Sequence, residues 1–428
     1  MILKVLMFGW EFPPYFAGGV GMVCYELVKE LSAKGVGIDY VMPFMPDDLS
    51  SDLANLVDVS RDVSDEELKK LNLTFSRVPS LLGAYQTPAE YEETLNAIYS
   101  QETKTITPRR RETDSTKKMY GENLLDEIEL FSKRVAAMIK KGAFRDCDVI
   151  HAHDWTTGKA AAVAKRMLGK PMVIHCHITE VNKNAGAGVT PEVYDVEREG
   201  FMAADKILSV SHTIKQTLID HYGIPSEKIE VVHNGGVEMG PVKVTEHEFK
   251  GDNKIVSYMG RVTGMKGPEN FIEMARLVLQ YVPNTKFILA GSGDKLQACI
   301  DKAAACGISD NVYFHGFYSR SDAELFYDLS DVFVLPSLME PFGVTPLEAM
   351  SKDTPTIVTK QSGVAEVVDN VFKADFWDVN RMASQIVSLL SYPVLHESMK
   401  TNGYHEAKAL TWEKPASSCL NIYNELRG

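Results

Sequence analysis

The stretch that decides the fold is VFVLPSLMEPFGVTPLEAM, residues 332–350. Its first residues form a short apolar run typical of a buried strand, and its last residues begin a helix. Thr345 and Glu348 stand at the two ends of Thr-x-x-Glu, which predicts a capping box with Pro346 at the first helical position. This pattern accounts for Glu348 but not for Glu340, which follows the strand directly. A carboxylate at the carboxyl end of a strand, beside a helix N-terminus, is typical of ligand sites in α/β proteins.

Strands and helices alternate through most of the chain. One series begins with KVLMFG at 4–9, and a second begins with KIVSYMG at 254–260, after a polar, glycine-containing linker at 235–253. Two such series predict an α/β protein with two Rossmann-like, doubly wound domains facing each other across a cleft. We expect the domains to cover 1–240 and 241–409, followed by an amphipathic helix over 410–428.

The composition is that of a soluble globular chain. The net charge of −13 over 428 residues argues against a nucleic-acid partner and against binding to a strongly anionic membrane. No apolar run approaches the length of a membrane span, and the N-terminal MILKVLMFGW is expected to be a buried strand rather than a signal peptide. Six cysteines without a CxxC pattern favour free thiols in a reducing compartment, so a cytoplasmic location is expected.

Two loops have the composition of phosphate sites. GRVTGMKG at 260–267 places Arg261 and Lys266 after a strand, and two cations in a glycine-flanked loop suit a diphosphate, although an ordinary exposed loop would have the same composition. AGGVG at 17–21 lacks the GxGxxG pattern of a dinucleotide fingerprint. Its glycines would let backbone N–H groups approach an anion at a helix N-terminus, and a plain turn is the alternative.

Four histidines follow two neighbouring strands, in HAHDW at 151–155 and HCH at 175–177. Alternate residues share a strand face, so the four rings could lie close enough for zinc. No carboxylate stands at a ligand spacing such as HExxH, which favours a single histidine pointing into the cleft over a metal cage. No metal is therefore expected.

The segment QETKTITPRRRETDSTKKMYG at 101–121 has little hydrophobic periodicity. We interpret it as a mobile, solvated loop. The alternative is that Arg109, Arg110 and Arg111 bind a partner or an acceptor.

Taken in order, the motifs GG, HxHDW, H, GRxxxxKG and EPFGVTPLEAM resemble the GT-B glycosyltransferases of family 4, and among these the bacterial and archaeal glycogen synthase-like enzymes. The resemblance covers nearly the whole chain except about 46–118. It implies the GT-B fold, with the C-terminal helix crossing back to the N-terminal domain. It also implies a nucleotide-sugar donor, a glucan or oligosaccharide acceptor, retention of the anomeric configuration, and no cofactor or metal.

The resemblance also implies roles for single residues of the second half. Arg261 and Lys266 would bind the donor diphosphate and stabilise the departing charge, and Glu340 would lie at the donor sugar. The remaining donor contacts would come from the backbone N–H groups of Gly343, Val344 and Thr345, from Glu348 at the ribose hydroxyls, and from Phe317 or Tyr318 against the base.

In the first half, the resemblance places His177 in the active site near the donor sugar, and the backbone N–H of Gly19 near the phosphates. Asp154, Trp155 and Glu180 would lie on the acceptor side. The first loop departs from the Lys-Thr-Gly-Gly-Leu of ADP-glucose glycogen synthases, because Phe16 stands in place of the lysine. This departure leaves the donor open between UDP-glucose and ADP-glucose.

The expected activity is glucosyl transfer to the non-reducing end of an α-glucan. Another family 4 transferase acting on a small sugar or a surface polysaccharide is the alternative within enzymes of this type. A nucleotide-sugar epimerase and a phosphorylase using pyridoxal phosphate share the GT-B architecture, and a sugar-binding protein without activity is the non-enzyme alternative. The oligomeric state does not follow from the sequence.

Overall fold

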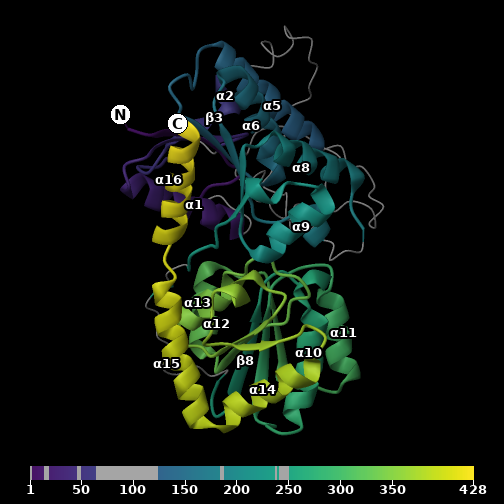
Figure 1. Cartoon of the computed structure of the whole chain (residues 1–428). Coiled ribbons are helices and arrows are strands. Elements are labelled where there is room, and N and C mark those ends of the chain that lie inside the picture. The colour runs from purple at the N-terminus through teal and green to yellow at the C-terminus, as the bar shows by residue number, and fades with distance from the viewer. Residues whose placement is uncertain are drawn as a thin grey trace, which may run out of the picture.

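The computed structural model describes residues 2–13, 19–45, 50–63, 124–183, 188–236, 239–240 and 250–428. The predicted loop at 101–121, with Arg109, Arg110 and Arg111, lies outside these ranges. Within them, the chain forms two parallel sheets, each covered by helices on both faces (Figure 1). None of the helices in the described ranges is both long and apolar enough to cross a membrane.

The first sheet has seven strands in the order β3-β2-β1-β4-β5-β6-β7, all parallel. The strands are β1 (Lys4–Phe8), β2 (Gly37–Met42), β3 (Asn55–Asp58), β4 (Val149–His153), β5 (Met172–Cys176), β6 (Lys206–Ser209) and β7 (Ile229–Val231). Its helices are α1 (Gly19–Ala33), α2 (Val59–Asp62), α5 (Leu124–Lys140), α6 (Asp154–Leu168), α7 (Glu180–Lys183), α8 (Pro191–Ala203), α9 (His212–Tyr222) and the 3-10 helix η1 (Ser226–Lys228). The sequence pattern did not indicate β3, which extends one edge of this sheet.

The second sheet has six parallel strands in the order β10-β9-β8-β11-β12-β13. The strands are β8 (Lys254–Met259), β9 (Thr285–Ala290), β10 (Val312–Gly316), β11 (Val332–Leu335), β12 (Thr356–Thr359) and β13 (Phe372–Ala374). The helices of this half are α10 (Pro268–Leu279), α11 (Leu296–Ala305), α12 (Arg320–Leu329), α13 (Thr345–Ser351), α14 (Val379–Ser391) and α15 (Pro393–Ala409), with the 3-10 helices η2 (Gly264–Lys266), η3 (Ser309–Asn311) and η4 (Gly363–Glu366). The chain ends with α16 (Glu413–Arg427).

Burial on both faces explains why the strands appear in the sequence as continuous apolar runs. In β1, Leu6 and Phe8 face one core cluster, and Val5 and Met7 face another on the opposite side of the sheet. Parallel sheets need helices on both faces, and such strands lack the alternation of a half-exposed sheet. The predicted α/β class with two doubly wound halves is confirmed.

The strand order reverses once in each sheet. In the first sheet the reversal lies between β1 and β4, and in the second between β8 and β11. Ligands of open α/β sheets bind outside the carboxyl ends of the strands at such a switch point. The second switch point carries GRVTGMKG after β8 and EPFGV after β11. The first switch point carries HAHDW at the end of β4 and the start of α6, and Gly19 at the start of α1, where the described residues resume after β1.

The final helix returns to the first half, as predicted. Trp412, Ala416, Cys419, Ile422 and Tyr423 belong to the core cluster that contains α1 and one face of the first sheet, and α16 packs beside α1 (Figure 1). The segment that leaves the first half lies beside the segment that returns to it. The N–H of Gly236 donates to the carbonyl of Leu410 at 2.6 Å. The predicted domain boundary at 240/241 adjoins residues outside the described ranges and stays a prediction.

The carboxyl ends of the two sheets face each other. After β12, the Glu366 carboxylate accepts hydrogen bonds from the backbone N–H groups of His212 at 2.9 Å and Thr213 at 3.2 Å, at the start of α9. The same carboxylate lies 2.8 Å from Nε2 of His233, which follows β7. On the other side, the Asn182 amide contacts the Met339 sulfur at 3.7 Å. These contacts join the segments that follow the strands of one sheet to those that follow the strands of the other.

Candidate active site

A buried ion pair occupies the switch point of the second half. The Lys266 ammonium donates to the Glu340 carboxylate, and their side chains are 15% and 7% exposed. The Ser337 hydroxyl is 3.4 Å from the same carboxylate. Lys266 follows β8 and Glu340 follows β11, which are neighbouring strands. A lysine held this way presents a fixed positive charge, and Glu340 supplies the counter-charge that burial requires.

Two glycines allow the close packing of the backbone around Lys266 and Glu340. Gly267, just after Lys266, has φ +65° and lies so close to Pro336 that a Cβ would come within 2.2 Å of the Pro336 carbonyl oxygen. Gly343 has φ +96°, and a Cβ there would lie 2.9 Å from Cγ of Glu340. Only glycine combines a positive φ with so little space. Gly267 therefore lets the Lys266 loop lie against the end of β11, and Gly343 leaves room for the Glu340 side chain within its own loop.

Arg261 lies on the same edge, directly after β8. Its backbone carbonyl accepts a hydrogen bond from the Tyr258 hydroxyl at 2.7 Å, which fixes the start of the loop. Its side chain is partly exposed, and its charge acts on Lys183 across the interface. Arg261 and Lys266 thus both belong to the segment after β8, at the edge of the sheet that faces the first half.

The predicted capping box of Thr345 and Glu348 is wrong. Helix α13 already begins at Thr345, so the cap position falls on Val344, which makes no side-chain capping hydrogen bond. The Glu348 carboxylate instead accepts a hydrogen bond from the Tyr327 hydroxyl at 2.9 Å. Burial raises the pKa of Glu348, and the hydrogen bond from Tyr327 opposes that rise. The prediction failed because Glu348 bonds to the Tyr327 hydroxyl on α12, a partner that the local sequence pattern does not reveal.

The two aromatic candidates for the base lie in different environments. Phe317 is 71% exposed after β10. Tyr318 is half-buried, and burial together with the negative charge of Glu348 raises the pKa of its hydroxyl. Tyr318 is thus the residue of this pair that lies near Glu348. Gly343, Val344 and Thr345 form the turn into α13 between Glu340 and Glu348, and their donor contacts stay predictions.

The first half holds His177 through Asp154. Oδ1 of Asp154 accepts the backbone N–H of His177 at 2.6 Å and that of Ile178 at 3.4 Å. Asp154 is buried and has φ +56°, a left-handed conformation that aspartate tolerates better than most residues. Asp154 at the start of α6 therefore orients the loop that carries His177, a positioning role that differs from direct contact with an acceptor.

The four histidines form one buried stack. Ring centroids are 4.6 Å apart for His151 and His153 and 4.4 Å apart for His175 and His177. Nδ1 of His153 lies 2.9 Å from Nε2 of His177, and His151 is hydrogen-bonded to the hydroxyl of Tyr423 from α16. Burial lowers the pKa of all four rings, which are therefore neutral near pH 7. The rings present neutral nitrogens rather than positive charge.

The other predicted site residues of the first half differ in burial. Gly19 opens α1 and is exposed, with open space around its Cα. Trp155 packs in the hydrophobic core and is 2% exposed. Glu180 is buried and accepts hydrogen bonds from the N–H and hydroxyl of Thr190 at 3.1 and 2.7 Å, which closes the loop around α7. The ligand contacts assigned to these residues stay predictions.

Two titratable residues near α7 have no signal in the sequence motifs. Burial lowers the pKa of Lys183 to about 7, with the positive charge of Arg261 acting in the same direction. Burial raises the pKa of Glu197 to about 8, and Glu197 bonds to the Tyr222 hydroxyl and to the N–H of Glu180 at 2.9 Å. Perturbed groups of this kind gather at functional sites, and only their tertiary neighbours identify them.

Comparisons with known proteins identify the family of the chain. Residues 242–406 match the family of glycosyl transferases group 1, and residues 4–229 match the starch synthase catalytic domain. Glycogen synthase of Mycobacterium tuberculosis is 24% identical over 434 residues, covering 98% of this chain and 94% of that protein. D-inositol 3-phosphate glycosyltransferase of Segniliparus rotundus is 27% identical over 316 residues, covering 67% of this chain and 70% of that protein. Sucrose-phosphate synthase of Thermosynechococcus elongatus has the same fold, with a TM-score of 0.71, 18% identity and 99% coverage of both chains.

The chain belongs to the GT-B glycosyltransferases, with an N-terminal half of the starch synthase catalytic type and a C-terminal half of group 1. The fold and the family predicted from the motifs are confirmed. Glycosyl transfer implies a sugar donor activated at its anomeric carbon and a sugar or sugar-like acceptor.

Proposed function

We propose that the chain transfers a glucosyl unit from UDP-glucose or ADP-glucose to the non-reducing end of an α-glucan, with retention of configuration. The observation that carries this proposal is the Lys266–Glu340 pair beside Arg261 at the switch point of the second half. The breadth of the similarity to a glycogen synthase, over 98% of the chain, supports the glucan acceptor.

Cleavage of a sugar–phosphate bond leaves negative charge on a nucleoside diphosphate. Lys266 and Arg261 would stabilise that charge as it develops, and their fixed positions avoid reorganisation during the reaction. Glu340 would hold the Lys266 ammonium in place and would contact the donor sugar. We propose that these two cations supply the positive charge that the step requires, so the transfer needs no metal ion.

The neutral His177 would contact the donor sugar from the first half. Asp154 would keep its loop in position, because it bonds the backbone of His177 rather than the ring. Contacts from opposite halves would form together only when the halves are closed, which would exclude water that otherwise hydrolyses the donor. The remaining proposed donor contacts are Gly19, Gly343, Val344, Thr345 and Glu348, with Phe317 or Tyr318 at the base.

A second candidate is transfer to a small acceptor. It is supported by relatives that act on D-inositol 3-phosphate, which are slightly more identical to this chain over a shorter alignment. Phe16 in place of the first-loop lysine also weakens the analogy with ADP-glucose glycogen synthases. Both candidates use the same donor chemistry and differ in the acceptor.

The test is nucleotide release from UDP-glucose, ADP-glucose, GDP-mannose and UDP-N-acetylglucosamine, each with and without glycogen. Glycogen-dependent release from one glucose donor, with radiolabelled glucose recovered in the polymer, is the expected result. Release that small acceptors stimulate and glycogen does not would select the second candidate. An absence of release from every donor, by protein with a normal melting transition, would contradict both.

A further inference from the structure

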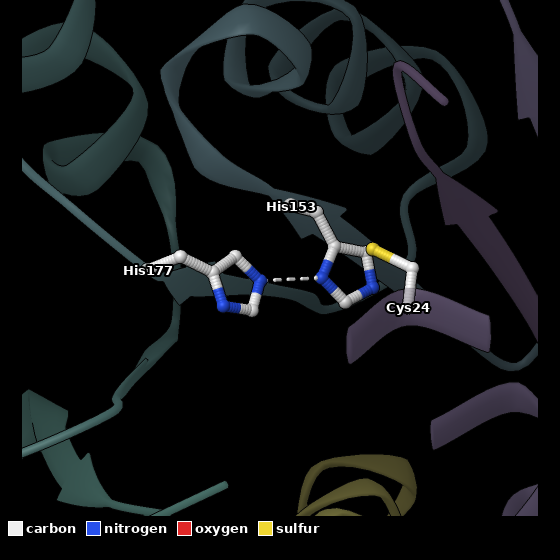
Figure 2. A group of neighbouring side chains, drawn as sticks. All are labelled: Cys24, His153 and His177. Atoms are coloured by element: carbon white, nitrogen blue, oxygen red, sulfur yellow. Dashed lines mark hydrogen bonds between the residues drawn. The ribbon is translucent and has the colours of Figure 1, made fainter. Parts of the chain in front are cut away.

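Three side chains of the first half converge in a way that glycosyl transfer does not require. Cys24 comes from α1, His153 ends β4, and His177 follows β5 (Figure 2). Each offers one ligand atom, and these three atoms lie within 4.8 Å of one another. Cys24, His153 and His177 are 1%, 2% and 6% exposed. We refer to these three residues as the thiol–imidazole group.

The ring nitrogens in this group are incompletely used. Nδ1 of His153 and Nε2 of His177 bond each other, while Nε2 of His153 and Nδ1 of His177 have no hydrogen-bond partner among the described residues. The neighbouring His175 has none at either ring nitrogen. Buried polar atoms in proteins are nearly always paired, so a cluster of incompletely paired imidazoles is unusual for a purely structural role.

The type of donor identifies the class of ligand. One cysteine sulfur and two imidazole nitrogens form a set that binds borderline and soft transition metals and binds Mg²⁺ or Ca²⁺ poorly. A Cys-His₂ set supplies three of the four positions of tetrahedral zinc and leaves one position for water or another ligand. Burial raises the pKa of the Cys24 thiol, so metal binding would displace the thiol proton into solvent as the metal–sulfur bond forms.

We propose that Cys24, His153 and His177 form a binding site for a Zn²⁺-like transition metal ion, and that the ion inhibits the enzyme by occupying His177. The binding site stands on the geometry of the three residues. The inhibition rests on the proposed function, in which His177 contacts the donor sugar. The ion is thus a regulator or inhibitor, which agrees with a transfer step that itself needs no metal.

Metal binding requires a small local adjustment. Zinc–ligand lengths of about 2.0–2.3 Å imply edges of roughly 3.3–3.6 Å between tetrahedral ligand atoms, somewhat less than the upper separation of these three. Rotation of the imidazole rings would separate Nδ1 of His153 from Nε2 of His177, which lie 2.9 Å apart, and would exchange their hydrogen bond for metal coordination, while the Cys24 sulfur moves closer to both. His177 is the most exposed of the three and gives the ion a route from the interface between the halves.

The first test uses Co²⁺ as a spectroscopic probe of the full-length, chelator-treated protein. The expected result is one bound Co²⁺, with a thiolate-to-cobalt charge-transfer band and visible bands of tetrahedral intensity, and competition by Zn²⁺. Cys24→Ser should abolish the charge-transfer band and weaken Zn²⁺ binding by at least roughly tenfold. Cys147→Ser is the matched control, because Cys147 is another buried free thiol of the same half, outside the group.

His153→Asn is a second variant, in case Cys24→Ser unfolds. It should retain the charge-transfer band at a higher Co²⁺ concentration and lose tetrahedral intensity. An absence of binding by the wild-type protein, or a Co²⁺ spectrum unchanged in both variants, would overturn the metal site.

The second test measures nucleotide release under the conditions that establish the activity. Zn²⁺ should inhibit the wild-type and Cys147→Ser proteins, a chelator should restore activity, and Cys24→Ser should resist inhibition by at least roughly tenfold in Zn²⁺ concentration. Equal inhibition of Cys24→Ser would overturn the inhibitory role. If no donor is turned over but the cobalt spectrum is as expected, the proposed function fails and the metal site stands.

Discussion

The two switch points have the same strand arrangement but differ in charge, because the second half carries charged side chains there and the first half carries neutral ones. In the second half, Lys266 and Arg261 are charged and Glu340 balances them. In the first half, burial lowers the pKa of His153 and His177, and the neighbouring Cys24 is a buried thiol with a raised pKa. The same strand order therefore supports a charged site in one half and a neutral, metal-ligand-like site in the other. The side chains that follow the strands determine which kind of site forms.

The largest expected effect comes from removing charge at the second switch point. Lys266→Ala should slow nucleotide release by roughly 2–4 kcal/mol of transition-state stabilisation, or about 30- to 1000-fold, because it removes a fixed cation and leaves Glu340 unpaired. Lys400→Ala is the control, since Lys400 lies on α15 of the same half and pairs with the exposed Glu397 at 3.8 Å. Near-normal turnover of Lys266→Ala would mean that the reaction does not need the positive charge of Lys266, and would contradict the contrast between a charged and a neutral switch point.

A pH profile tests whether Lys183 extends the charged switch point across the interface. The pKa of Lys183 is about 7 in the free protein, and a bound diphosphate would raise it, so donor binding takes up a proton. Affinity for the intact nucleotide-sugar should therefore fall as pH rises above about 7, by up to roughly tenfold per unit until the pKa of the complex is reached. Titration calorimetry from pH 6 to 9 measures this, and Lys183→Met should flatten the profile. An identical slope in Lys183→Met would exclude Lys183 from the donor site.

A smaller effect is expected where the halves touch. Glu366→Gln should destabilise the protein by about 1 kcal/mol, because the carboxylate accepts charge-assisted hydrogen bonds at the start of α9 and from His233. Burial would raise the pKa of Glu366, but the bonds from His233, His212 and Thr213 together lower it. A lowered pKa contributes stability above the ordinary value near 4.5, and this stability is lost as pH falls through the folded value.

Denaturant titrations at pH 7 and at pH 3.5 measure the Glu366 contribution. The wild-type advantage over Glu366→Gln should shrink at the lower pH. Glu397→Gln, an exposed site on α15, should show neither effect. Equal destabilisation at both values would mean that the charge of Glu366 plays no part.

The smallest expected effect concerns α13. Tyr327→Phe and Glu348→Gln should be coupled by roughly 0.5–1.5 kcal/mol in a double-mutant cycle of unfolding free energies, because their side chains bond directly. Thr345→Ala should not couple to Glu348→Gln, since the two residues form no capping box. Coupling of Glu348→Gln to Thr345→Ala instead of Tyr327→Phe would mean that Thr345 and Glu348 form a capping box after all.

The sequence predicted most of the fold because its signals are local. Apolar runs bounded by glycine loops mark the strands of both halves, and they place Lys266 and Glu340 each directly after a strand. The structure adds that these two strands are neighbours. The weakly periodic region before residue 124 concealed β3, a short strand that, among the described residues, pairs with β2 at the edge of the sheet. The apolar face of α16 was visible in the sequence, and its return to the first half followed from the family resemblance.

Contacts between distant elements could not be read in this way. The hydroxyl of Tyr327 displaced the capping box, Glu366 joined α9 from the other half, and Cys24 reached the histidines from α1. Each depends on which helix packs where, and no local spacing encodes it. The histidine pairs were apparent in the sequence, but their neutral state depends on burial that only the folded structure reveals.

The most direct test of the contrast between the two switch points is calorimetric binding of UDP and ADP to the wild type, Lys266→Ala and His177→Ala, beside their rates of nucleotide release. The account predicts that Lys266→Ala weakens binding of the preferred diphosphate by roughly 10- to 100-fold, the value of one charged hydrogen bond, and that both variants lose turnover. His177→Ala should bind the diphosphate like the wild type. Equal loss of affinity in both variants, or full affinity in Lys266→Ala, would contradict the assignment of diphosphate binding to the charged switch point.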